Sequence, residues 1–194
     1  MTQEGKHTTS APDGLLAWIE REHCAELNLC DLLERIADNL PEPLDRELAS
    51  TGIIMLRHCL KWHIALEEGY LYPVLAKRAA PGELTEAMLV QIRAEHAADE
   101  CLAHDTADLL EQTLARGHAE NPEMLGFMLR GFFEGRRRHI TCEDEFILPL
   151  ARRRLARDDF RDFSPEAFEK SIGAGNLFEL FPHAKCGCGQ DHGE

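Results

Sequence analysis

The sequence predicts an all-α protein, an antiparallel up-down-up-down four-helix bundle with a short C-terminal helical extension. Strand patterns are almost absent, whereas Ala, Leu, Glu and Arg fill long stretches at helical spacing. Proline and glycine interrupt these stretches near residues 39–45, 79–83 and 116–123. Four long helices joined by short turns are typical of such a bundle.

The first helix is expected to follow a leader at residues 1–13 and to end at the turn "NLPEPLD". Its inward stripe, spaced by three and four residues, is Leu16, Ile19, His23, Leu27, Cys30 and Leu33. The second and third helices occupy the stretches between the three turns. The fourth follows "RGHAENPE", and its inward stripe is Leu125, Phe132, His139, Phe146 and Leu150. The bundle should therefore span residues 14–157.

Residues 158–194 are expected to form a C-terminal extension. Ser164 is a helix N-cap followed by Pro165 and Glu166, which predicts one short helix. The tail beyond it contains His183, Cys186, Cys188 and His192. These ligand types suit zinc, but their spacing is tighter than in zinc fingers, so a tail without metal is the alternative.

Composition limits the function classes. A chain of 194 residues that is 44% hydrophobic fits one domain with a sizeable core. Its formal net charge of -14 argues against a nucleic-acid partner and favours a cation. No stretch is apolar enough for a membrane span or a signal peptide, so we expect no membrane contact and a cytoplasmic location. The seven cysteines are then expected to be thiols, none of them bridged.

An internal repeat carries the chemistry. "HIALEEGYLYPVLAKR" begins at His63 and "HITCEDEFILPLARRR" begins at His139. Each has a glutamate four residues after the histidine, Glu67 or Glu143, then a second acid and a proline. In the same way "REHCAE" around His23 matches "AEHAAD" around His96. The bundle therefore resembles a duplicated helical hairpin with pseudo-twofold symmetry.

The four histidines of the repeat should lie at one level of the bundle. In an antiparallel hairpin, two residues at equal distance from the turn lie at the same level. Each predicted turn is at equal distance from the two residues of the repeat that flank it, which are histidines or, in one case, a glutamate and a histidine. A glutamate four residues after a histidine is rotated by about 40° and displaced by about 6 Å along the helix, so it enters the same interior space.

Four imidazoles and two carboxylates buried together predict a metal site. Without a partner, each buried charge would cost several kcal/mol, whereas bound cations remove that cost. Mixed nitrogen and oxygen ligation suits iron, with manganese or zinc possible. If both carboxylates bridge two ions and a bridging oxygen joins the ions as well, roughly two coordination positions stay open for small ligands. A histidine that only fills the core is the alternative at any single position. The ferritin-like Glu-x-x-His motif occurs once, at Glu20 and His23, and not twice as that arrangement needs.

This pattern resembles the haemerythrin-like, or HHE cation-binding, domain over about residues 14–157. The resemblance implies a haemerythrin-like four-helix bundle with a non-haem di-iron centre of two iron ions. It implies the metal ligands His23, His63, Glu67, His96, His139 and Glu143. Family members bind oxygen, sense oxygen, nitric oxide or redox state, or handle iron.

Two positions differ from the oxygen carriers of that family, which have H-x-x-x-H on the third helix and H-x-x-x-x-D on the fourth. Here Glu100 stands four residues after His96, and both Glu143 and Asp144 follow His139. The repeat aligns Glu143 with Glu67, which favours Glu143. The spacings are more similar to those of bacterial iron-centre repair proteins.

The expected function is to bind or sense a small ligand such as oxygen, nitric oxide or peroxide. The alternatives are iron-centre repair or iron donation, a peroxide-consuming enzyme, and a regulator that signals to a protein partner through the C-terminal extension. Ligands are expected to enter past Gly135 and Cys59, unless Gly131 and Gly135 only let helices approach closely. Cys30 and Tyr70 are candidates for positions near the metals, with core packing as the alternative.

Overall fold

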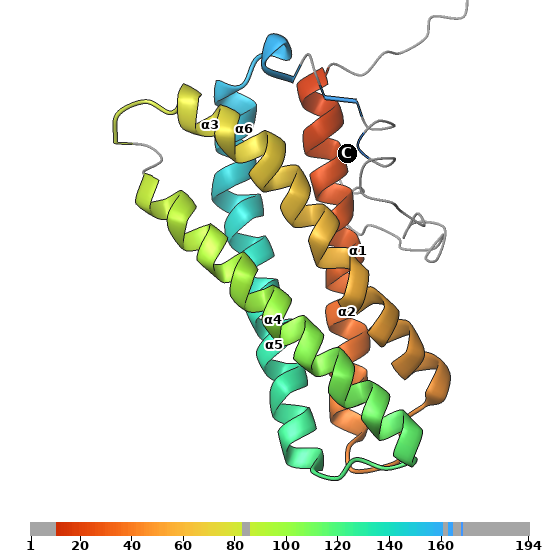
Figure 1. Ribbon diagram of the computed structural model, residues 1–194. Coiled ribbons are helices and arrows are strands. Elements are labelled where there is room, and N and C mark those ends of the chain that lie inside the picture. Colours follow the sequence, from red (N-terminus) through yellow and green to blue (C-terminus); the bar gives the residue numbers. More distant parts are fainter. Residues whose placement is uncertain (1–10, 83–85, 161–162, 165–167, 169–194) are drawn as a thin grey trace, which may run out of the picture.

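The computed structural model describes residues 11–82, 86–160, 163–164 and 168. Within these residues every regular element is a helix, which confirms the all-α prediction (Figure 1). The long helices are α1 (Ala11–Asn39), α2 (Arg46–Leu66), α4 (Glu86–Arg116) and α5 (Pro122–Cys142). After α2 come the π-helical segment η1 (Glu67–Leu71) and helix α3 (Tyr72–Arg78). After α5 come η2 (Glu143–Ile147), α6 (Leu148–Arg154) and the 3₁₀ turn η3 (Arg157–Phe160).

Local chemistry explains where the long helices begin and end. The carboxylate of Asp45 caps α2 by accepting hydrogen bonds from the backbone N–H groups of Glu47 and Leu48, at 2.9 and 3.0 Å. Asn121 caps α5 in the same way, and Pro122 occupies the first turn, where no N–H is needed. Gly117 ends α4 with φ +81°, a conformation that other residues adopt at a cost. The breaks predicted from proline and glycine are therefore confirmed.

The four long helices enclose a common interior. Both α1 and α4 pack against α2 and α5. In Figure 1 the turns that follow α1 and α4 lie at one end of the bundle, and α3 and α6 lie at the other end. Buried apolar side chains form two clusters, one toward each end. Leu33, Leu110 and Phe132 belong to one cluster, and Ile19 and Leu75 belong to the other. The histidines and glutamates of the repeat occupy the layer between them.

The π-helical segments begin at the two glutamates of the repeat. Pro73 and Pro149 follow within the first two positions of α3 and α6. A proline inside a helix lacks an N–H and presses on the preceding turn, and a wider π turn relieves this crowding. The wider π turn also changes the directions of the side chains within it, so that Ile147 is buried whereas Phe146 is 60% exposed. The prediction that Phe146 faces the core is wrong for this reason.

One position on α1 also differs from the predicted stripe. Leu27 is 36% exposed, and the neighbouring Glu26 is buried in its place, at 1% exposure. Glu26 takes the inward position because its carboxylate pairs with the buried guanidinium of Arg136. The predicted apolar stripe is therefore interrupted by an ion pair.

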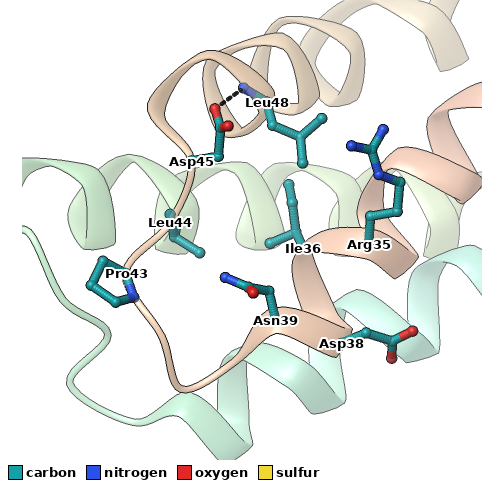
Figure 2. A pocket seen from close by; sticks show the side chains of 8 residues that line it. All are labelled: Arg35, Ile36, Asp38, Asn39, Pro43, Leu44, Asp45 and Leu48. Atoms are coloured by element: carbon teal, nitrogen blue, oxygen red, sulfur yellow. Dashed lines mark hydrogen bonds between the residues drawn. The ribbon is translucent and has the colours of Figure 1, made fainter.

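Beside the turn between α1 and α2 lies a surface pocket of about 610 Å³ (Figure 2). Its lining includes Arg35, Asp38, Asn39 and Asp45. None of the predicted metal ligands lines this pocket. It lies at the end of the bundle, away from the polar layer.

Beyond α6, Phe163 and Phe168 pack edge to face against Trp18, with ring centroids 6.5 Å apart in both pairs. Both rings also contact Tyr70, so Tyr70 is a packing residue. The tail with Cys186 and Cys188, and most of the helix predicted after Ser164, lie outside the described residues. Among the helices that the structure describes, none has the length and apolar character needed to cross a membrane.

Candidate metal centre

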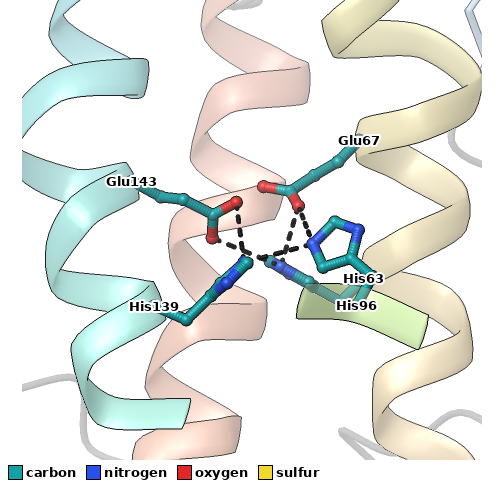
Figure 3. A group of neighbouring side chains, drawn as sticks. All are labelled: His63, Glu67, His96, His139 and Glu143. Atoms are coloured by element: carbon teal, nitrogen blue, oxygen red, sulfur yellow. Dashed lines mark hydrogen bonds and ion pairs between the residues drawn. The ribbon is translucent and has the colours of Figure 1, made fainter. Parts of the chain in front are cut away.

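The six residues predicted as ligands gather in the polar layer, and all are buried. Ligand atoms of five of them lie within 4.8 Å of one another (Figure 3); these five are His63, Glu67, His96, His139 and Glu143. His23 joins the group through its Nε2, which lies 3.3 Å from Oε2 of Glu143. Each long helix contributes one histidine, and each π-helical segment contributes its first residue.

The histidines form two pairs. The rings of His23 and His63 have centroids 5.0 Å apart, and the rings of His96 and His139 are 4.8 Å apart. Nε2 of His96 and Nε2 of His139 face each other at 3.1 Å. These two nitrogens are therefore close enough to share one ion.

Both glutamates span the two pairs. Oε2 of Glu143 lies 3.3 Å from Nε2 of His23 and 3.5 Å from Nε2 of His63, and Oε1 lies 3.1 Å from Nε2 of His139. Oε2 of Glu67 lies 3.0 Å from Nε2 of His63 and 3.3 Å from Nε2 of His96. Each carboxylate therefore reaches a histidine of each pair, as a bridging ligand would.

The other ring nitrogen of every histidine faces a carboxylate. The four pairs are His23 with Asp144 at 2.7 Å, His96 with Glu68 at 2.8 Å, His139 with Glu95 at 3.1 Å and His63 with Glu26 at 3.9 Å. At His23, His96 and His139 the carboxylate is within hydrogen-bond distance, so it holds the proton on Nδ1 and leaves Nε2 free to bind a metal. At His63 the distance to Glu26 is too long for a hydrogen bond. Three of the four imidazoles are thus oriented toward the centre of the layer by a hydrogen bond.

The choice between Glu143 and Asp144 has a geometric basis. Glu143 lies in the cluster at 1% exposure, whereas Asp144 has a half-exposed side chain that contacts His23 from outside. Its counterpart in the repeat, Glu68, contacts His96 in the same way. The second acid of the repeat therefore orients the lone histidine of the other half. Glu100, the other open position, does not belong to the cluster.

Opposite charges stabilise the cluster in the metal-free protein. Burial alone would lower the pKa of His63, but the carboxylates of Glu26 and Glu67 raise that pKa well above its ordinary value. Burial alone would raise the pKa of Glu143, but hydrogen bonds with His139 and His23 hold it well below its ordinary value. A cation that binds here must displace protons from the imidazoles.

Several buried donor atoms in the layer have no hydrogen-bond partner. They include Nε2 of His23, both ring nitrogens of His63, Oε1 of Glu26, Oε1 of Glu67 and Oε2 of Glu143. Buried polar atoms are rarely left without a partner, and these point to one another. Imidazole nitrogen and carboxylate oxygen suit iron, manganese and zinc. The residues present therefore fit a site for divalent metal ions.

Tyr72, which sequence reasoning missed, is part of the centre. Its buried hydroxyl lies within hydrogen-bond distance of the carboxylates of both Glu67 and Glu143 and can donate its single proton to either one, and its ring stacks on His96. Burial and the two carboxylates raise the pKa of this hydroxyl, so it remains a donor. The repeat gave no signal, because the position of Tyr72 corresponds to Leu148 in the other half.

Replacing Tyr72 with phenylalanine should lower the free energy of unfolding of the metal-free protein by about 1–3 kcal/mol, because two buried carboxylates lose their donor. With a divalent cation bound the loss should be smaller, since the cation then balances the carboxylates. Urea unfolding with and without Zn²⁺ measures both values, with Tyr70→Phe as the control. Equal losses in the two conditions would contradict this role.

The ion pair between Glu26 and Arg136 was also not predicted. Both side chains are 1% exposed, and Nη1 of Arg136 lies 3.6 Å from Asp99. The only available signal was position: Glu26 is three residues after His23, and Arg136 is three residues before His139. The pair lies beside the centre, because Glu26 faces Nδ1 of His63.

The cysteines differ in state. Cys30 is a buried free thiol, and burial raises its pKa to about 12, so it remains protonated and inert. Cys24 is disulfide-bonded, which corrects the expectation that no cysteine is bridged. Its partner is not among the side chains that the structure describes, and neither is Cys59.

No curated protein and no solved structure matches the chain. One family model does match, the Hemerythrin HHE cation binding domain, over residues 14–151. That span contains the whole buried cluster and most of the chain. The chain therefore belongs to the Hemerythrin HHE cation binding domain family.

Proposed function

We propose that the protein binds two iron ions and that this centre binds or senses oxygen, nitric oxide or peroxide. One ion would be held by His23 and His63, the other by His96 and His139, with Glu67 and Glu143 shared. The proposal includes helices that alternate in direction and a cytoplasmic location. The observation that carries it is the pair of carboxylates, each within 3.5 Å of a histidine from both pairs.

The donor count supports two ions rather than one. Four imidazole nitrogens and four carboxylate oxygens exceed the roughly six positions of a single ion and leave open positions on two. Bound iron would supply those open positions and redox chemistry toward oxygen-containing ligands. The protein's part is to orient three of the imidazoles through Asp144, Glu68 and Glu95 and to exclude water with the two apolar clusters.

Metal analysis tests this proposal directly. Protein purified from iron-fed cells should contain about two irons per chain, with the near-ultraviolet absorption of an oxygen-bridged pair. His96→Ala should lower the iron content, and His104→Ala is the matched control, because His104 lies on the same helix but contacts Arg57, away from the cluster. Protein that holds only zinc, or no metal at undiminished stability, would refute the proposal.

A second candidate is iron donation or peroxide consumption. A pocket that reaches His139 favours it, since exchange needs access from solvent. Three measurements on the reduced protein separate the functions: reversible oxygen binding, peroxide turnover, and loss of iron to an acceptor. A sensor should bind its ligand without turning over peroxide or losing iron at an appreciable rate, and should in addition change its contacts with a partner, for which the C-terminal extension is the candidate.

A further inference from the structure

The two halves of the centre differ in their access to solvent. A pocket of about 340 Å³ lies between α4 and α5, and His139 is the one predicted ligand among its lining residues. Glu95 and Asp99 line it from α4, and Gly135, Arg138 and Cys142 line it from α5. The pocket therefore opens onto the half that contains His96 and His139.

The internal repeat identifies the corresponding place in the other half. By the alignment of the two histidine motifs, Arg138 corresponds to Trp62, Cys142 to Leu66 and Gly135 to Cys59. On the preceding helix Glu95 corresponds to Glu22 and Asp99 to Glu26.

Those corresponding side chains close the first half. Trp62 is 8% exposed and Leu66 is fully buried, so a ring and an isobutyl group stand where the second half has Arg138 and Cys142. Glu22 and Glu26 are each 1% exposed, whereas the side chain of Glu95 is 46% exposed. His63 is fully buried and His139 is 5% exposed. Among the described side chains the pseudo-symmetry is therefore broken, because those of the first half are buried where those of the second half line a pocket.

Gly135 is not needed to let neighbouring helices pack closely. A Cβ at this position would meet its nearest atoms at 3.9 and 4.0 Å, on Arg138 and Asp99, both of which line the pocket. At Gly131 the nearest atom would be 3.8 Å away, on Leu102. A side chain at residue 135 would therefore occupy the pocket without pressing on the core.

We infer that this pocket is the port of the metal centre, through which the ion held by His96 and His139 exchanges with solvent, while the ion held by His23 and His63 is closed in. This inference depends on the proposed two-ion centre. Two carboxylates at the port, Glu95 and Asp99, outweigh the one guanidinium of Arg138, so the net negative charge favours the passage of a divalent cation. The two ions should consequently leave the protein at different rates.

The test uses Fe²⁺ alone as the probe. Reduced protein loaded with Fe²⁺ is mixed anaerobically with an excess of a ferrous chelator, and the release is followed by absorbance. Two phases of equal amplitude are expected. A closing variant, Arg138→Trp with Cys142→Leu, copies the side chains of the closed half. It should slow the fast phase by about tenfold, about 1.4 kcal/mol in the barrier, and leave the slow phase unchanged.

The matched control is Arg138→Ala with Cys142→Ala, which alters the same residues without filling the pocket. The rate of the fast phase should not fall in this variant. If the closing variant does not fold, as judged by its melting curve, Gly135→Leu fills the same pocket, with Gly131→Leu as its control. Three results would contradict the inferred port: a single release phase, equal slowing of both phases in the closing variant, or slower release in the control variant as well. Failure to bind two ions would instead refute the proposed function, so the two failures are distinguishable.

Discussion

Replacing Glu143 with alanine should abolish stoichiometric binding of both metal ions, and Glu67→Ala should do the same. Each carboxylate lies within 3.5 Å of a histidine from both pairs, so its loss removes a ligand from both ions at once. Metal content after dialysis, measured per chain, should fall well below one ion in either variant.

Asp144→Ala is the matched comparison, because it removes the adjacent carboxylate. Asp144 only orients His23, and losing such a partner typically weakens metal binding by roughly 10- to 100-fold rather than abolishing it. A titration of the metal-free variant with Zn²⁺ measures that change. If Asp144→Ala lowered the metal content more than Glu143→Ala does, the fourth ligand helix would be in the other register, with the H-x-x-x-x-D pattern of the oxygen carriers.

The second large effect should come from the buried ion pair of Glu26 and Arg136. Glu26→Leu should lower the free energy of unfolding by about 3–5 kcal/mol, since it leaves a buried guanidinium without its main partner. Arg136→Met should cost less. Glu26 can then take up a proton and become neutral, whereas an arginine cannot lose its proton in a protein.

The double variant tests the cause. Glu26→Leu with Arg136→Met replaces both charges by apolar groups, and such replacements are often neutral or stabilising. We expect it to recover most of the loss seen with Glu26→Leu alone, as measured by urea unfolding of the four proteins. If the loss of unfolding free energy in the double variant equalled the sum of the two single losses, the two charges would act independently.

The turns and the cluster could be predicted from sequence because their signals are local. Pro122 and Gly117 have backbone requirements that hold in any surroundings. The repeated His-x-x-x-Glu fixes two side chains on one helix face, and the level of each histidine follows from the position of the turns. Glu143 could be preferred over Asp144 because the internal repeat supplies a second copy for comparison.

Other features could not be predicted, for physical reasons. The exposure of Phe146 depends on the π turn that contains it, which changes the directions of its side chains but has no distinctive composition. The pairing of Glu26 with Arg136 joins residues far apart in sequence, and isolated charges are ordinarily assigned to the surface. The port depends on which of two corresponding pockets is filled, and that requires the burial of Trp62 and Leu66 to be known.

The reciprocal contacts between the two halves bear on how such a centre can originate. Glu68 and Asp144 each orient the lone histidine of the opposite hairpin, so neither hairpin completes its own site. Two copies of one ancestral hairpin could complete each other as a homodimer, but identical chains would have either two open ports or none. Fusion after gene duplication removes that restriction. Residues such as Trp62 and Arg138 can then diverge independently, and one chain can keep one ion secure and the other accessible.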